Sequence, residues 1–264
     1  LYFLACGEHL DWGYVDQPPL IALVAWLVRH TLGTSLLAIR LPSALAGAAL
    51  TLLTGLLARE LGGGRFAMGL SAAASALAFV YVVMHYLFTM NAYEPLFWTG
   101  CAFTVVRIVR TGDQKLWLWL GLIAGLGLQN KYSMAVYGLG LVVGVLLTPE
   151  RRALRQPWIW LAGAVAALVF LPNLIWNVQH GWPFFELMRN IRASGRDVVL
   201  APGDYVLRQA LNMNPANLPI GLAGLGFFPE ELRTYPQGPV AAQVLGFAGL
   251  DNKGLEGLER SLEG

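Results

Sequence analysis

Long apolar runs are the feature that most constrains what this chain can fold into. A helix needs about 20 mostly apolar residues to cross the hydrocarbon core of a membrane. Residues 18–30 are apolar but short, which favours an interfacial helix, and residues 215–228 are also too short to span. Six runs are predicted to span the membrane: 37–58, 66–84, 95–109, 116–128, 133–147 and 158–175. Of these, 116–128 and 133–147 are short and need flanking residues to complete a span. The sequence therefore predicts an all-α, polytopic transmembrane helical bundle.

The composition agrees with a membrane protein and excludes other classes. Only 13% of the residues are charged and 56% are hydrophobic, whereas soluble domains contain about 25% charged residues, so a disordered chain or an ordinary soluble enzyme is not expected. A net charge of +2 gives no basic field, which argues against a nucleic-acid partner. The two cysteines, Cys6 and Cys101, are too few for a disulfide framework or a cysteine zinc site.

The basic residues of the short loops predict the orientation, because such residues favour the cytoplasmic side. Three alternate loops carry eight of them: Arg59, Arg65, Arg107, Arg110, Lys115, Arg151, Arg152 and Arg155. The opposite short segments carry three: Arg29, Arg40 and Lys131. The long segment 176–214 on that outer side holds four arginines. Because such arginines can meet an anionic ligand, Arg189 is counted among the candidate substrate-binding residues.

Four polar segments are expected together on the outer face, at residues 7–19, 85–95, 129–132 and 176–214. They hold most of the histidines and the acids that lie near the membrane surface: His9, His85, His180, Asp11, Asp16 and Glu94. The inward loops are short connectors. A functional site is therefore expected at the outer membrane surface, with His85 among its candidate substrate-binding residues.

Several of these polar residues have a structural interpretation beside the functional one. Asp16 precedes two prolines that suit a helix start, so it can be a cap. Asn91 and Glu94 can cap the next helix, although an acid at membrane depth is usually functional. Lys131 is either a snorkelling lysine in a tight helical hairpin or a point charge for a phosphate.

Four motifs occur in an order that resembles the bacterial glycosyltransferases of the protein-mannosyltransferase and aminoarabinose-transferase kind, which have the GT-C fold. The motifs are WGYVDQPPL (12–20), TMNAYEPLFW (89–98), GLQNKY (127–132) and HGWP (180–183). The resemblance covers about residues 1–228. It implies a multi-span enzyme of the bacterial inner membrane. Such an enzyme takes a sugar from a polyprenyl-phosphate donor and transfers it, with inversion, to an acceptor on the extracytoplasmic face.

The resemblance also implies roles for single residues. Asp16 matches an acid near the catalytic centre that is linked to a metal or to the donor phosphate, and Tyr14 matches an aromatic residue at the same turn. Gln17 stands where many relatives have His or Lys. Asn91 stands where other branches carry a second acid, which weakens a mechanism based on two carboxylates.

Sugar transfer needs a general base for the acceptor hydroxyl and positive charge for the leaving phosphate. Lys131, an outer-loop arginine or a divalent metal ion held by Asp16 could supply the charge. Lys131 matches the family's basic residue near the lipid-linked phosphate, and Glu94 and Tyr132 are counted with it as candidate substrate-binding residues. The resemblance places the catalytic acid pair just before Leu1, so an N-terminally truncated, inactive fragment is expected.

Residues 229–264 differ in character from the rest of the chain. They resemble the non-catalytic N-terminal module of class B penicillin-binding proteins, or they form an amphipathic tail that matches by chance. No Ser-x-x-Lys or Lys-Thr-Gly signature is present, so no transpeptidase chemistry is expected. The tail is too small to build a core of its own. The expected division is a partial GT-C-like domain at 1–228 and a foreign, poorly ordered tail at 229–264.

Two other function classes compete with a membrane glycosyltransferase. A transporter or lipid flippase predicts ionisable residues at mid-membrane and inverted repeats, and the sequence has neither in clear form. A non-catalytic membrane scaffold is the third class. The leading prediction is therefore a glycosyltransferase whose partners are membrane lipid, a polyprenyl-phosphate-linked sugar, and a lipid, glycan or protein acceptor.

Overall fold

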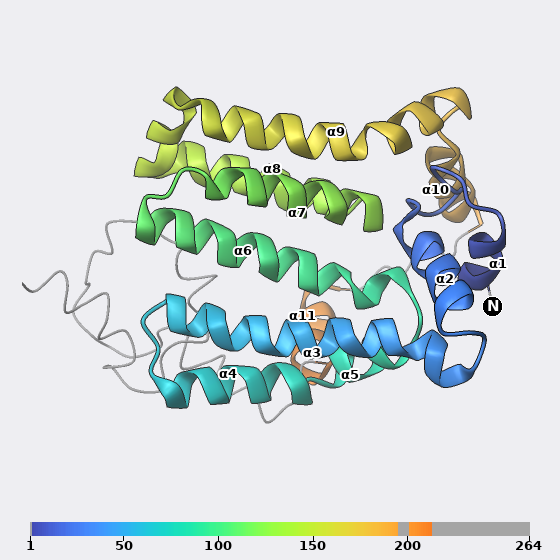
Figure 1. Ribbon diagram of the computed structural model, residues 1–264, viewed down its shortest axis with the longest axis horizontal. Helices are drawn as coiled ribbons and strands as arrows, with labels where there is room; N and C mark the ends of the chain where they lie inside the picture. The colour runs from blue at the N-terminus through green and yellow to red at the C-terminus, as the bar shows by residue number, and fades with distance from the viewer. Residues whose placement is uncertain (1, 195–200, 213–264) are drawn as a thin grey trace, which may run out of the picture.

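The computed structural model describes residues 2–194 and 201–212, and these residues form an all-α bundle (Figure 1). The helices are α1 (Tyr2–Glu8), α2 (Leu20–Thr31), α3 (Leu36–Glu60), α4 (Arg65–Leu77), α5 (Phe79–Tyr86), η1 (Met90–Ala92), α6 (Glu94–Thr111), α7 (Leu116–Asn130), α8 (Met134–Leu147), η2 (Pro149–Arg155), α9 (Pro157–Gln179), α10 (Pro183–Ala193) and α11 (Pro202–Asn212). The predicted all-α helical bundle is confirmed. The predictions for residues 215–228 and for the tail 229–264 lie outside the described residues.

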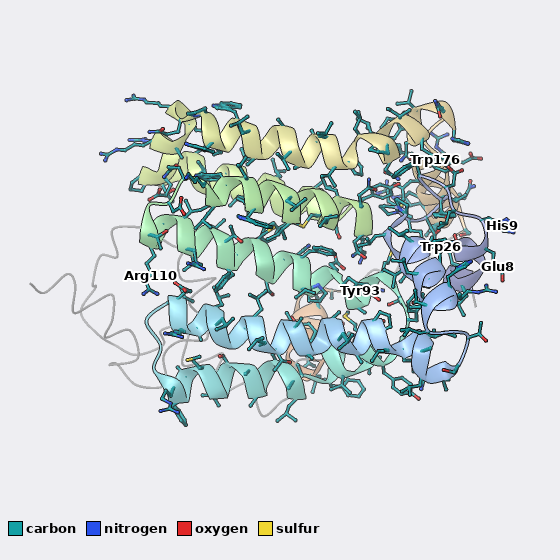
Figure 2. The ribbon with its side chains drawn as sticks, viewed as in Figure 1. Glu8, His9, Trp26, Tyr93, Arg110 and Trp176 are labelled. Atoms are coloured by element: carbon teal, nitrogen blue, oxygen red, sulfur yellow. The ribbon has the colours of Figure 1, made fainter. Side chains whose placement is uncertain are left out.

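The long helices run side by side, and the connections gather at two opposite ends of the bundle (Figure 1). Packing joins α9 to α7, α7 to α6, α6 to α3 and α3 to α4. One end, here called the polar end, carries α1, α2 and the segments 9–19, 87–93 and 131–133. The other, the basic end, carries the connections 61–64, 112–115 and 148–156. Figure 2 shows Arg110 at the basic end and Glu8, His9 and Trp176 at the polar end.

Within the described part of the chain, two helices, α3 and α9, are long and apolar enough to cross a membrane alone. The count of such spans rises to four if the bent pairs α4 with α5 and α8 with η2 each form one. The predicted spans 95–109 and 116–128 correspond to α6 and α7, which fall outside that test. Helix α6 carries Glu94, Arg107 and Arg110, and α7 has only 15 residues, about 22 Å of helix.

One predicted span is wrong as a continuous helix. Residues 66–84 form α4 and α5, which meet at an angle of 59°. The break lies at Ala78, whose backbone is extended with φ −63° and ψ 117°. This bend turns α5 beside α3 and places His85 in the second half of the broken span.

Close backbone contact fixes α9 against α7. A Cβ atom on Gly121 would lie 2.3 Å from the carbonyl oxygen of Ala162, and one on Gly125 would lie 2.7 Å from Cβ of Val169. Small residues of this kind let two membrane helices approach closely. The contact aligns the C-terminal half of α9 with the end of α7, which brings Asn173 and Asn177 to the polar end.

Candidate functional site

The first polar segment is fixed on α9, more than 150 residues later in the chain. The indole N–H of Trp176 donates to Oδ2 of Asp11 at 2.8 Å. The side-chain amide of Asn173 donates to the carbonyl oxygen of Trp12 at 2.8 Å. Gly13 lies so close to the Trp176 ring that a Cβ atom would approach it to 2.3 Å. The segment therefore has one defined position over the end of the bundle.

Asp16 lies in this segment and pairs with a tyrosine of α1. The hydroxyl of Tyr2 donates to Oδ1 of Asp16 at 2.5 Å. Burial raises the pKa of Tyr2, and the hydrogen bond to Asp16 raises it further, so Tyr2 stays protonated and remains a donor. Asp16 does not cap α2, because Pro19 occupies the N-cap position and no side chain caps that helix.

Tyr14 and Gln17 hold the turn together from inside. The Tyr14 hydroxyl lies 3.0 Å from the carbonyl oxygen of Cys6 and 2.9 Å from that of His9, and it accepts from the backbone N–H of Asp11 at 3.2 Å. Burial raises the pKa of Tyr14. The side chain of Gln17 is fully buried and contacts Cys6 Sγ at 3.8 Å. Both predicted binding residues therefore face the protein in this structure.

The second and third polar segments meet at Lys131. Its ammonium group donates to Oε2 of Glu94 at 2.7 Å and to Oδ1 of Asn91 at 2.9 Å. The hydroxyl of Ser133 donates to the other carboxylate oxygen of Glu94. The side chains of Lys131 and Glu94 are 32% and 18% exposed. Lys131 is thus held by the protein and does not extend away to solvent.

Neither Asn91 nor Glu94 acts as a side-chain cap. The N-cap residue of α6 is Tyr93, and no side-chain cap hydrogen bond is formed there. Glu94 is the first residue of α6, where a carboxylate is stabilised by the helix dipole. The two side chains are instead directed to Lys131, so they form a cluster with it and Ser133, called here the Lys131 cluster.

The residues beside Lys131 tie this cluster to its surroundings. The amide of Asn130 donates to the carbonyl oxygen of Met90 at 3.0 Å, and that of Gln129 donates to the carbonyl oxygen of Val169 at 2.7 Å. The edge of the Tyr132 ring faces Phe184, with ring centroids 5.0 Å apart. The motif at residues 127–132 therefore connects η1, α7, α9 and α10.

Two asparagines of α9 connect the first polar segment (residues 7–19) to the third (residues 129–132), although neither was predicted as a site residue. Asn177 donates to the Tyr132 hydroxyl at 3.2 Å and to Oδ1 of Asn173 at 3.0 Å, while Asn173 reaches Trp12. Their side chains are 2% and 0% exposed. Two amides four residues apart within an apolar helix were a signal, because polar side chains at membrane depth are usually functional or structural partners.

The other predicted site residues do not join the Lys131 cluster. Nδ1 of His85 lies 2.6 Å from the carbonyl oxygen of Tyr81, and its ring packs on Gly47 of α3. Arg189 is exposed on α10 and forms no ion pair with any described residue. Within the described residues, no three His, Cys, Asp or Glu side chains are grouped for a metal ion, so the divalent metal at Asp16 stays a prediction.

Most of the residues that form this end of the bundle lie within a match to a known protein family. Residues 16–176 match the family described as dolichyl-phosphate-mannose-protein mannosyltransferase. The lipid A galacturonosyltransferase RgtD of Rhizobium johnstonii is 30% identical over 181 residues, which are 66% of this chain and 37% of that protein. The chain therefore spans little more than a third of this relative. No solved structure matches the chain.

A second, short similarity is of a different kind. The probable peptidoglycan D,D-transpeptidase FtsI of Caulobacter vibrioides is 48% identical over 44 residues, which are 17% of this chain and 8% of that protein. This gives weak support to the predicted resemblance of residues 229–264 to class B penicillin-binding proteins. The family match, by contrast, runs from Asp16 to Trp176 and includes the whole Lys131 cluster.

Proposed function

The chain belongs to the dolichyl-phosphate-mannose-protein mannosyltransferase family, and from this premise we propose that it acts in membrane glycosyl transfer from a polyprenyl-phosphate-linked sugar. The polar end is the proposed place of transfer. The acceptor is a lipid, a glycan or a protein. Because the relative RgtD is named as a lipid A galacturonosyltransferase, a glycan carried on a lipid is the acceptor class that we propose first.

The observation that carries this proposal is the Lys131 cluster. An ammonium group has three N–H donors, and Asn91 and Glu94 use two of them. The third is available for a phosphate oxygen, for which lysine is a good point charge. Because the neighbouring side chains already fix the ammonium position, little reorganisation is needed when charge develops on the leaving phosphate.

Glu94 and Asn91 are the residues that orient this lysine. A carboxylate beside Lys131 partly offsets its charge, and the hydrogen bond from Ser133 fixes that carboxylate. A phosphate that binds Lys131 therefore meets an ammonium group that is held in position and has one N–H left to donate. We assign Lys131 to the donor phosphate, and Asn91, Glu94 and Ser133 to its positioning.

Asp16 is proposed as a second polar contact at the same end. One of its carboxylate oxygens accepts from Tyr2, which leaves the other for a hydroxyl group of a bound sugar. The described residues do not build a divalent metal site around Asp16, because no group of three suitable ligands occurs among them. We assign the charge on the leaving phosphate to Lys131.

We place the polar end on the extracytoplasmic face of the bacterial inner membrane. Its support is the distribution of basic residues, since the eight arginines and lysines of the short loops cluster at the opposite end. No specific observation favours a transporter, a flippase or a non-catalytic scaffold.

The test is donor binding by the chain in lipid nanodiscs, measured with a polyprenyl phosphate by native mass spectrometry. Loss of a charge-assisted hydrogen bond in Lys131→Ala is expected to weaken binding about tenfold or more. Lys115→Ala is the matched control, because it removes an exposed lysine at the basic end. Equal binding by the wild type and Lys131→Ala would remove the role given to this lysine.

A further inference from the structure

A second polar site lies inside the bundle, on the side away from the Lys131 cluster. A half-open cavity of about 200 Å³ lies between α3, the last turn of α4, and α5. Its polar lining comes from Thr51 of α3, Ser75 of α4, and Tyr81 and His85 of α5. It exists because the broken span turns at Ala78, so that α5 does not continue the line of α4 (Figure 1).

Two polar atoms at this cavity are buried without a partner among the described residues. One is the hydroxyl oxygen of Ser75, whose side chain is only 8% exposed, and the other is Nε2 of His85. A buried polar atom without a hydrogen bond is costly. Two such atoms beside one cavity therefore indicate that a polar group belongs between the helices.

The hydrogen-bonding character of His85 can be assigned. Its Nδ1 lies 2.6 Å from the carbonyl oxygen of Tyr81. Since a carbonyl oxygen only accepts, Nδ1 must carry the proton, and in neutral imidazole Nε2 is then a bare acceptor. Contact with Gly47 holds the ring in this orientation, because a Cβ atom there would lie 2.8 Å from Cγ of His85.

The end of α4 adds further acceptors. The last four carbonyl groups of an α-helix have no partner within the helix, and in α4 these include the carbonyls of Ser75 and Ala76, both at the cavity. Nearby, Ala78 accepts from the backbone N–H groups of Tyr81 and Val82. The cavity thus offers an acceptor at His85 and hydroxyl groups that both donate and accept, a combination that suits an occupant with hydroxyl groups of its own.

Charge and size narrow the class of occupant. Among the described residues, no Asp, Glu, Lys or Arg lines the cavity, so these residues offer neither an ammonium ion nor a phosphate an opposite charge. A volume of about 200 Å³ equals the share of about seven water molecules in the liquid. We propose that this cavity binds a neutral hydroxyl-bearing group, such as a glycerol or single-sugar head group, through Ser75 and His85.

The cavity lies in the membrane-spanning part of the bundle, so the first source to test is a lipid. The probes are phosphatidylglycerol, which carries a glycerol head group, and phosphatidic acid, which is also anionic but lacks it. Binding to the full chain in phosphatidylcholine nanodiscs would be counted by native mass spectrometry. The wild type is expected to prefer phosphatidylglycerol to phosphatidic acid by about tenfold.

The variants separate a built site from general lipid binding. Ser75→Ala and His85→Leu are each expected to reduce the preference about fivefold or more, whereas His85→Gln keeps an acceptor and retains part of it. Ser71→Ala is the matched control, since Ser71 is also buried on α4 but its hydroxyl donates to the carbonyl oxygen of Met68. Gly47→Ala provides an independent variant that displaces the His85 ring while keeping its polar atoms.

A second arm distinguishes a lipid from a soluble source. Free glycerol is added to the protein in phosphatidylcholine nanodiscs, and the shift in thermal unfolding is compared between the wild type and Ser75→Ala. A Ser75-dependent shift with glycerol but no preference for phosphatidylglycerol would assign the site to a soluble polyol. Equal retention of both lipids, together with a glycerol shift unaffected by Ser75→Ala and His85→Leu, would overturn the proposal. No sugar donor is used, so failure here leaves the proposed glycosyl transfer untouched.

Discussion

The two sides of the bundle differ in how their buried polar side chains are held. On the α6–α9 side, Asn173, Asn177 and Lys131 donate to named partners at 2.7–3.2 Å, and α7 lies directly against α9. On the α3–α5 side, a span is broken, a cavity opens, and Ser75 and His85 each keep an unpaired atom. The α6–α9 side also has two unpaired oxygens, those of Gln129 and Asn130, but both belong to amides that donate to a backbone carbonyl and are held by it. The Ser75 hydroxyl forms no hydrogen bond with a described residue and lies at a cavity.

This difference predicts where the protein resists substitution. On the α6–α9 side, backbone contacts leave no room to relax, so added atoms are destabilising. On the α3–α5 side, a small loss or gain of volume can be absorbed by the cavity.

The largest effect is expected from Gly121→Ala. The new Cβ atom would lie 2.3 Å from the carbonyl oxygen and 2.8 Å from Cα of Ala162, both backbone atoms. Since neither can move aside as a flexible side chain would, α7 and α9 must separate, at a cost of about 3 kcal/mol. Reversible unfolding in detergent measures it. Gly163→Ala on α9 is the control, because nothing lies within 4 Å of its Cβ position, and equal stability of the two variants would contradict the tight contact.

Next in size is Asn173→Ala, expected to cost about 2 kcal/mol, because it removes a buried donor from the Trp12 carbonyl and a partner from Asn177. The effect should be concentrated in the first polar segment. Faster hydrogen exchange at residues 11–17, compared with an unchanged rate in α4, would show it. Asn190→Ala is the matched control, since Asn190 is exposed on α10. Uniform loss of protection throughout the bundle would mean that Asn173 does not specifically hold this segment.

How far the sequence predicted these features depends on the range of the forces involved. The apolar runs predicted the helices because hydrophobic pattern is local, and the alternation of helices predicted that the polar segments share one end. The break at Ala78 was not predicted because the site holds neither Pro nor Gly. His85 was therefore expected beside Lys131, whereas the bend carries it to a separate cavity. Gln17 was expected to meet a ligand, although tertiary packing buries it under α1.

Asn173 and Asn177 are residues whose contacts the sequence pattern did not predict. Asn173 lies within the predicted span 158–175 and Asn177 in the predicted outer segment 176–214, so the sequence pattern alone does not bring them together. In the folded chain, Asn173 donates to the carbonyl oxygen of Trp12 and Asn177 donates to the hydroxyl of Tyr132. Both partners lie far from α9 in the sequence. Ser133 was overlooked for a similar reason, because its partner Glu94 lies 39 residues earlier.

An intermediate effect is expected at the Lys131 cluster. Lys131→Met leaves Glu94 without its cation, which should cost about 1–2 kcal/mol, less than the 3–5 kcal/mol of a fully buried pair because both groups are partly exposed. Lys131→Met combined with Glu94→Gln should recover most of that stability but not donor binding. A double-mutant cycle measured by unfolding gives the coupling. Recovery of both properties would show that the cluster has a structural role alone.

At Ser75 the change in the free energy of unfolding on substitution by alanine is expected to have the opposite sign to that at Asn173. Removing a buried hydroxyl that has no partner relieves its desolvation cost, so Ser75→Ala should leave stability unchanged or raise it by up to about 1 kcal/mol in phosphatidylcholine. Asn173→Ala, which removes a paired group, must lower it. Unfolding of both variants in the same phosphatidylcholine nanodiscs tests this. A loss at Ser75 comparable to that at Asn173 would mean that the Ser75 hydroxyl is paired as Asn173 is.

The smallest effect is expected at the pair of Tyr2 and Asp16, where half of the tyrosine surface is exposed. Burial, and then the hydrogen bond to Asp16, raise the pKa of Tyr2 above its ordinary value of about 10. A raised pKa means that the folded state favours the protonated phenol. The contribution of Tyr2 to folding stability is therefore fully present below about pH 10 and is lost as the pH rises through the pKa of the folded state. The absorbance difference between the wild type and Tyr2→Phe isolates this phenol during an alkaline titration. In Asp16→Asn the transition should move partly back toward pH 10, because the effect of burial persists. An unchanged transition would mean that Asp16 does not hold Tyr2, and the contacts of Tyr14 and Gln17 with Cys6 would then be what joins the first polar segment to α1.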